Sequence, residues 1–152
     1  MKTIEELREE KKEYIMSYRN LKNLIRIEED RLRQFRIDKS IPSAIRYTGM
    51  PSGSGGSSDL SNYEVREEEL IESVERVKEN YYRKLREIHD AVHAISNKEY
   101  VEILELRYLG KKTSWKKIAD KMSYSESRIY ELRNKALDAF EIPESQVEDE
   151  QI

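Results

Sequence analysis

Apolar residues in the first 38 positions recur at alternating intervals of three and four. This spacing places them along one narrow side of a helix, as in the seam of a coiled coil. Two charged residues, Lys11 and Glu28, occupy positions of the same series, so the seam needs a partner helix. The apolar positions are Ile4, Leu7, Tyr14, Tyr18, Leu21, Ile25, Leu32 and Phe35. With Thr3 and Glu6 at the spacing of a capping box, the pattern predicts one long helix over residues 1–38.

A second stripe of this kind predicts another long helix over residues 63–95. Ser61 and Glu64 have the spacing of a capping box at its start. The stripe consists of Leu70, Val74, Val77, Tyr81, Leu85, Ile88, Val92 and Ile95. Residues 39–62 are rich in Gly, Ser and Pro, which predicts a flexible linker. Helices of similar length can form an antiparallel hairpin within one chain or arms that pair between two chains, and the pattern permits both.

The C-terminal third predicts a small helical domain over residues 96–141, so the expected fold class is all-α. Ser96 and Glu99 again have capping-box spacing, and Gly110 is placed to end the next helix in the left-handed conformation. Residues 142–152 are expected to form an acidic tail, because this segment carries acidic residues and no basic one.

The segment TSWKKIADKMSYSESRIYELRNKALDAF has the residue pattern of a helix-turn-helix motif. A first helix presents apolar residues and one small residue where two helices cross, an aromatic residue fills the turn, and a serine caps a second helix with further apolar positions. The residues in that order are Ile118, Ala119, Met122, Tyr124, Ser125, Ile129, Leu132, Ala136 and Phe140. Ser123 stands where such turns most often have glycine. A positive φ there would cost serine on the order of 1 kcal/mol without forbidding the turn.

If these apolar residues face inward, a polar face of the second helix is left for DNA. Side chains near the start of a recognition helix reach base edges; arginine suits guanine, and a carboxylate suits the amino group of cytosine. The predicted base-reading residues are Ser127, Arg128, Tyr130, Glu131 and Asn134. The predicted phosphate contacts are Lys111, Lys112, Lys116, Lys117, Arg133 and Lys135.

The distribution of charge along the chain supports this interpretation better than the net charge does. The net charge of −3 is not typical of a DNA-binding protein. Between Gly110 and Lys135, however, eight Lys or Arg residues stand against three acidic ones. Apolar residues make up 37% of the chain and charged residues 39%, which is typical of long solvated helices around a small core. The charged N-terminal segment and the lack of a long apolar run predict a cytoplasmic protein that does not enter a membrane.

The two histidines, His89 and His93, have the spacing of the zinc-binding helix of metalloproteases. Asp90 stands where that motif requires a glutamate, the chain has no third histidine, and it has no cysteine. No arrangement of a nucleophile with a base is evident elsewhere. The sequence therefore predicts no catalytic site, no metal site and no cofactor, and the protein is not expected to be an enzyme.

The segment EYVEILELRYLGKKTSWKKIADKMSYSESRIYELRNKALDAF resembles region four of bacterial sigma factors, and this resemblance covers roughly residues 97–141. With its GMPSGSGGSSD linker between two long helices, most of the chain resembles the ArpU and RinA group of late-gene regulators from phages of Gram-positive bacteria. The resemblance implies activation of late genes by binding promoter DNA and engaging the host RNA polymerase.

The expected function is therefore a sequence-specific regulator of transcription that binds double-stranded DNA, as a homodimer or small oligomer. Two alternatives stay open. One is a small terminase subunit, which recognises DNA for phage packaging and also joins a helix-turn-helix to coiled helices. The other is an adaptor that binds polymerase through its sigma-like module without reading DNA.

Overall fold

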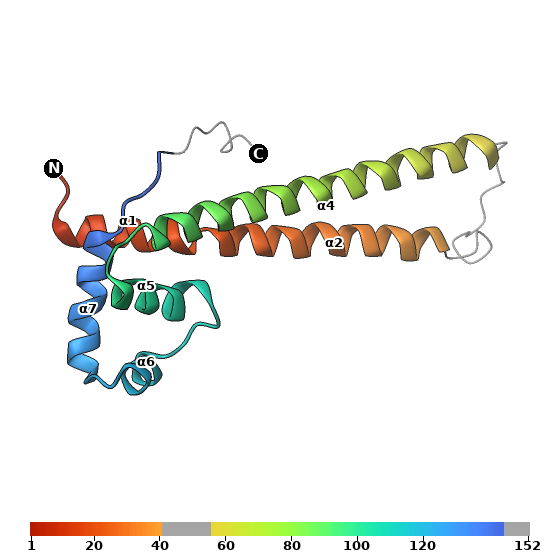
Figure 1. Cartoon of the computed structure of the whole chain (residues 1–152). Helices are drawn as coiled ribbons and strands as arrows, with labels where there is room; N and C mark the ends of the chain where they lie inside the picture. The colour runs from red at the N-terminus through yellow and green to blue at the C-terminus, as the bar shows by residue number, and fades with distance from the viewer. Residues whose placement is uncertain (41–55, 145–152) are drawn as a thin grey trace. The chain divides into compact units, whose positions relative to one another are not determined.

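The computed structural model describes residues 1–40 and 56–144 of the chain, and this part contains helices and no strand (Figure 1). The predicted all-α class is confirmed. The elements are α1 (Ile4–Met16), α2 (Tyr18–Ser40), α4 (Gly56–His93), α5 (Lys98–Leu104), the π-helix η1 (Glu105–Leu109), α6 (Trp115–Met122) and α7 (Glu126–Ala139). Most of the predicted linker, residues 41–55, and most of the predicted acidic tail, residues 145–152, lie outside the described residues.

The described residues form two compact units. One consists of residues 1–20 together with the chain from Tyr82 onward, and the other of Leu21–Tyr81. The first unit contains α1, the C-terminal end of α4 and all the later elements, and the second contains the paired lengths of α2 and α4. No helix of the described part is long and apolar enough to cross a membrane.

In the second unit, α2 and α4 run side by side as a hairpin within one chain (Figure 1). Arg36 Nε and Lys39 Nζ on α2 lie 3.3 and 3.1 Å from the carboxylate of Glu67 on α4. The rings of Phe35 and Tyr63 pack with their centroids 5.7 Å apart. The contacts between these two helices are therefore those of the hairpin alternative.

Both predicted stripes lie on the less exposed sides of the hairpin helices. On α2, Leu21 and Ile25 are half-buried, as are Leu32 and Phe35 further along. On α4, Val74 and Val77 are buried. The start of α4 differs from the prediction, because the helix begins at Gly56 and not at residue 63. A Ser and a Glu three residues apart also occur inside helices, so this spacing alone does not locate a helix start.

The N-terminal helix is not one continuous element, since a single residue, Ser17, separates α1 from α2. The Ser17 hydroxyl donates a hydrogen bond to the Tyr14 carbonyl oxygen at 2.6 Å, and the Ser17 amide donates to the same oxygen at 3.1 Å. Such local bonding of a serine competes with the regular helical pattern and bends helices. The long N-terminal helix expected over residues 1–38 is therefore bent at this residue and extends to Ser40, and the predicted capping box of Thr3 and Glu6 is confirmed.

The break gives α1 a different partner from the one that the seam predicted. Ile4 and Leu7, both on the predicted seam, are exposed, whereas Ile15, which lies off it, is fully buried. Helix α1 contacts α7 and η1. The first turns of α1 thus depart from the repeat, whereas Tyr14, which belongs to the repeat, is half-buried between Lys84 of α4 and Phe140.

The helix before the motif also begins and ends differently from the prediction. The residue that caps α5 is Asn97, whose side chain accepts a hydrogen bond from the Glu99 amide at 2.9 Å, and not Ser96. Gly110 has φ −107°, so it is not left-handed. Its amide donates to the Glu105 carbonyl at 3.0 Å, which is the bond of a π-helix. The chain therefore leaves this helix without a left-handed residue at Gly110.

Candidate nucleic-acid interface

The helix-turn-helix is built around a small apolar core shared by α5, α6 and α7. Its buried members are Ile103, Ile118, Ala119, Ile129 and Leu132. Ala119 on α6 is 3% exposed, and its small side chain allows the close approach of another helix that the sequence pattern predicted. Further along α7, Ala136 and Phe140 are also buried. The predicted inward positions of the motif are confirmed.

The turn between α6 and α7 has the backbone that the motif requires. Ser123 has φ 59° and ψ 41°, and it is the one described non-glycine residue with a positive φ. The Tyr124 amide donates to the Ala119 carbonyl at 3.0 Å, which closes the end of α6. Ser125 then caps α7, because its hydroxyl oxygen accepts a hydrogen bond from the Arg128 amide at 3.1 Å. These bonds fix the direction in which α7 leaves the turn.

Tyr124 ties this turn to the helix beneath it. Its ring packs against the motif core, and its hydroxyl lies 2.9 and 3.1 Å from the two carboxylate oxygens of Glu99, at the start of α5. The hydrogen bond to the Glu99 carboxylate raises the pKa of the Tyr124 phenol. A residue predicted to fill the turn thus also carries a polar link to α5.

The predicted base-reading residues lie on the outer side of α7. Ser127, Arg128, Tyr130 and Glu131 are exposed, and Asn134 is half-buried. Arg128 Nη1 lies 2.9 Å from Glu131 Oε2, an ion pair between positions three apart on one helix face. The two charged residues predicted to contact bases are therefore paired with each other.

Five of the predicted phosphate-binding residues are exposed lysines. They are Lys111 and Lys112 after η1, Lys116 and Lys117 in the first turn of α6, and Lys135 on α7. Within residues 1–40 and 56–144, none of the five has an ion-pair partner, so their charges are free to meet phosphates. Arg133 differs because it is half-buried, and its Nε and Nη2 atoms lie 3.3 and 3.1 Å from Asn134 Oδ1.

A stack of aromatic and guanidinium groups lies beside the motif, and sequence analysis did not identify it. The guanidinium carbons of Arg107 and Arg133 lie 4.6 and 5.4 Å from the centroid of the Trp115 ring. The Tyr130 ring lies 5.5 Å from Trp115 on another side. Arg107 Nη1 also donates to the Thr113 carbonyl at 3.1 Å. In the sequence, the available signal was a set of basic residues interleaved with aromatic ones. Their contact in one stack depends on how η1, α6 and α7 pack, which the sequence pattern does not specify.

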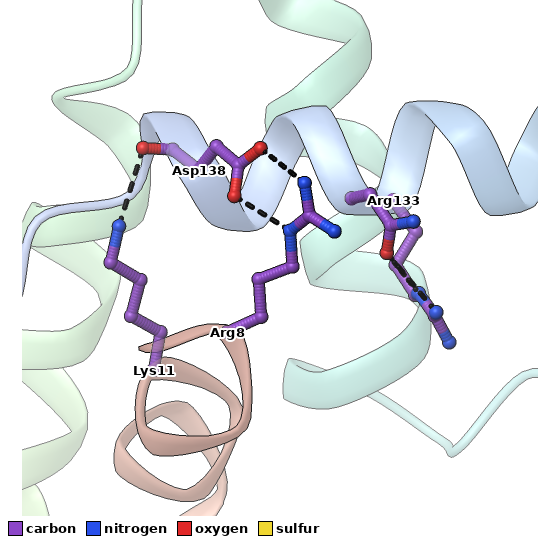
Figure 2. A network of polar contacts seen from close by, with 5 residues as sticks. Arg8, Lys11, Arg133 and Asp138 are labelled. Atoms are coloured by element: carbon purple, nitrogen blue, oxygen red, sulfur yellow. Dashed lines mark hydrogen bonds and ion pairs between the residues drawn. The ribbon is translucent and has the colours of Figure 1, made fainter. Parts of the chain in front are cut away.

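Helix α1 braces α7 near its C-terminal end (Figure 2). Arg8 donates from Nε and Nη2 to the two carboxylate oxygens of Asp138, each at 2.7 Å. Lys11 Nζ donates to the Asp138 carbonyl oxygen at 3.3 Å. The hydrogen bonds from Arg8 lower the pKa of the Asp138 carboxyl. Helix α7 is thus held at this end by a helix more than a hundred residues away in sequence.

Outside the interface, the structure adds a third potential metal ligand to the two histidines. His93 Nε2 lies 2.5 Å from Glu105 Oε1. Potential ligand atoms of His89, His93 and Glu105 all lie within 4.8 Å of one another. The histidine spacing alone could not reveal Glu105, because the turn between α4 and α5 brings it close.

Comparison with known proteins gives one family. Residues 64–141 match the model of a family described as "Protein of unknown function (DUF1492)", and this range is just over half of the chain. It includes most of α4 and all of α5, η1, α6 and α7. No curated protein and no solved structure gives a significant match.

Proposed function

Because this chain belongs to the DUF1492 family, whose function is unknown, we propose its function from the candidate interface itself. The protein is a sequence-specific regulator of transcription that binds double-stranded DNA through the helix-turn-helix of α6 and α7. The observation that carries the proposal is the combination of a capped, left-handed turn at Ser123 with an exposed polar face on α7. Ordinary packing of two short helices does not require both features.

In the proposed complex, the first half of α7 enters the major groove and α6 crosses the backbone. Ser127, Arg128 and Glu131 stand at the exposed start of α7, where base edges come within reach. Lys116 and Lys117 flank the start of α6 and neutralise phosphates. This division supports a readout in which lysines supply affinity and α7 supplies specificity.

The ion pair between Arg128 and Glu131 is compatible with this role. Their side chains are 44% and 62% exposed, and exposed pairs of this kind contribute little to stability. Arg128 can therefore exchange Glu131 for the O6 and N7 atoms of guanine at low cost, which frees the carboxylate for a cytosine amino group. The pair also gives the two side chains a shared orientation before binding.

The resemblance to the ArpU and RinA group extends the proposal to the control of phage or prophage late genes in the bacterial cytoplasm. In this extension, the protein binds promoter DNA as a homodimer or small oligomer and contacts the host RNA polymerase. The helical hairpin offers a surface for contact with a second copy of the chain or with the polymerase.

A salt titration tests the phosphate contacts. The binding site is first located by footprinting on the DNA that surrounds the gene, and duplexes with the cognate and a scrambled sequence are then compared. Replacing Lys116 and Lys117 by Ala should weaken binding to both duplexes and reduce the slope of log affinity against log salt by about two. The matched control replaces Lys22 and Arg26, two exposed basic residues of α2, and should leave the slope unchanged.

Arg128→Ala tests base reading. This variant should lose roughly 1–3 kcal/mol of binding free energy at one base position and keep its nonspecific affinity. A variant that retains full preference for the cognate duplex would exclude Arg128 as a base reader. If no variant changes binding to either duplex, the adaptor alternative is favoured. Native mass separates the terminase alternative, since those subunits form large rings.

A further inference from the structure

We propose that His89, His93 and Glu105 form a binding site for a divalent transition metal ion of the zinc class. The site lies outside the candidate DNA interface and does not depend on the proposed function. It joins the C-terminal end of α4 to the start of η1, both within the same compact unit.

The two histidines are arranged as a chelating pair. Residues four apart on a helix lie on the same side, one turn above the other. The imidazole rings of His89 and His93 are stacked with their centroids 6.2 Å apart. His89 is half-buried, and the side chain of His93 is 57% exposed, so an ion can reach both from solvent.

The turn between α4 and α5 brings the third ligand, Glu105, to the histidines. Glu105 is the first residue of the π-helix η1, and its carbonyl accepts the hydrogen bond from Gly110 that defines the π geometry. Isolated π-turns are rare and occur frequently at functional sites. Here Glu105 directs its carboxylate at His93, with Oε1 2.5 Å from Nε2.

The distances fit a small tetrahedral ion after minor side-chain movement. With zinc–ligand bonds of about 2.0 Å, neighbouring ligand atoms lie about 3.3 Å apart. The three ligand atoms here lie within 4.8 Å of one another, and the closest pair is 2.5 Å apart. The exposed His93 and the half-buried Glu105 can make the movements of roughly 1 Å that this requires. Water would complete the coordination.

The ligand chemistry selects the class of ion. Two imidazoles and one carboxylate suit zinc and its neighbours, whereas magnesium and calcium prefer oxygen ligands. The C-terminal end of a helix carries partial negative charge, which favours a cation beside the last turn of α4. These are the only two histidines of the chain, and it has no cysteine, so no other site of this type can form within one chain.

The test uses the full-length protein without a histidine tag. Titration with zinc chloride, followed by calorimetry, should give one ion per chain. In nitrogen-15 NMR spectra of the imidazole groups, both histidines should change in step with that titration. Magnesium chloride at the same concentrations should produce neither effect. No binding of zinc, or binding without a change at both histidines, would overturn the proposal.

Three variants assign the site to these residues. Removing a residue that only hydrogen-bonds to a metal ligand costs about 10- to 100-fold in metal affinity. His93→Gln and Glu105→Gln each remove a ligand itself, so each variant should lose at least that much affinity for zinc. Asp90→Asn is the matched control, because Asp90 is an exposed acid next to His89 on another side of the helix, and it should bind zinc normally. Circular dichroism verifies that each variant is helical. Unchanged affinity in His93→Gln and Glu105→Gln would mean that zinc binds scattered carboxylates, and the proposal would fail.

Discussion

At the scale of single residues, Ser123 shows how the motif tolerates an unfavourable side chain. Its left-handed backbone is the conformation that glycine adopts without cost and other residues adopt with strain. The strain is retained because hydrogen bonds at the end of α6 and at the start of α7 both require this turn. The Tyr124 amide closes α6, and Ser125 caps α7 immediately afterwards.

Ser123→Gly should therefore stabilise the protein. Relief of the left-handed strain exceeds the greater entropy of glycine in the unfolded chain, and the expected gain in the free energy of unfolding is about 0.5–1 kcal/mol. Urea denaturation measures this difference. Ser123→Ala keeps the strain and is the control, so an equal gain in that variant would show that backbone conformation is not the cause.

At the scale of elements, the contact between α1 and α7 decides how the second helix of the motif is supported. Arg8 reaches both carboxylate oxygens of Asp138 (Figure 2). Just after α1, at the first residue of α2, the Tyr18 hydroxyl donates to the Tyr108 carbonyl in η1 at 2.7 Å. A helix that resembled one half of a coiled coil thus completes the C-terminal domain.

This contact predicts a dependence of stability on pH. Because Arg8 holds the pKa of Asp138 below its unfolded value, the contribution of the pair is complete above that value and is lost as the pH falls through the folded pKa. Arg8→Ala should lower the free energy of unfolding at pH 7 by about 0.5–1 kcal/mol, since the pair is bidentate but partly exposed. Urea denaturation at a series of pH values measures the difference from wild type, which should shrink in acid.

Lys12→Ala is the control for this experiment. Lys12 forms an exposed ion pair with Glu9 at 3.8 Å within α1, and its removal should have little effect at either pH. A loss in Arg8→Ala that is the same at pH 7 and in acid would show that Arg8 acts by packing and not through the Asp138 carboxylate.

At the scale of the whole molecule, the hairpin seam determines whether the chain can form its long helices. Leu21 and Ile25 are half-buried on α2, two turns and one turn before Glu28, respectively. Glu28 accepts a hydrogen bond from Ser73 of α4 at 3.1 Å, which identifies this side of α2 as the one that faces α4. The remaining side of α2 carries Leu24 and Ile27, which are 42% and 41% exposed.

Replacing Leu21 and Ile25 by Lys should destabilise the hairpin. Full burial of such a side chain contributes about 1.5–3 kcal/mol, so two half-buried residues should account for roughly 2 kcal/mol. Thermal denaturation and sedimentation velocity measure the loss of stability and any dissociation of an oligomer. The control replaces Leu24 and Ile27 by Lys and should leave the melting temperature nearly unchanged. If the control alone changes sedimentation, the outer side of α2 carries assembly.

The sequence by itself determined the features that depend on residues close together along the chain. Helix periodicity located both hairpin stripes, and cap chemistry located the starts of α1 and α7. The helix-turn-helix pattern identified the buried positions from Ile118 to Phe140 and the strained conformation of Ser123. These predictions succeeded because each rests on spacing within a few helical turns.

Only the tertiary structure decided the features that join distant segments. Packing of α1 against α7 and η1 buries Ile15 and gives Arg8 a partner at Asp138. Packing of η1 against α6 brings Arg107 onto Trp115, and the turn between α4 and α5 brings Glu105 to His93. The spacing of neighbouring residues does not predict such long-range contacts, because each contact depends on which faces of two separate helices are buried together.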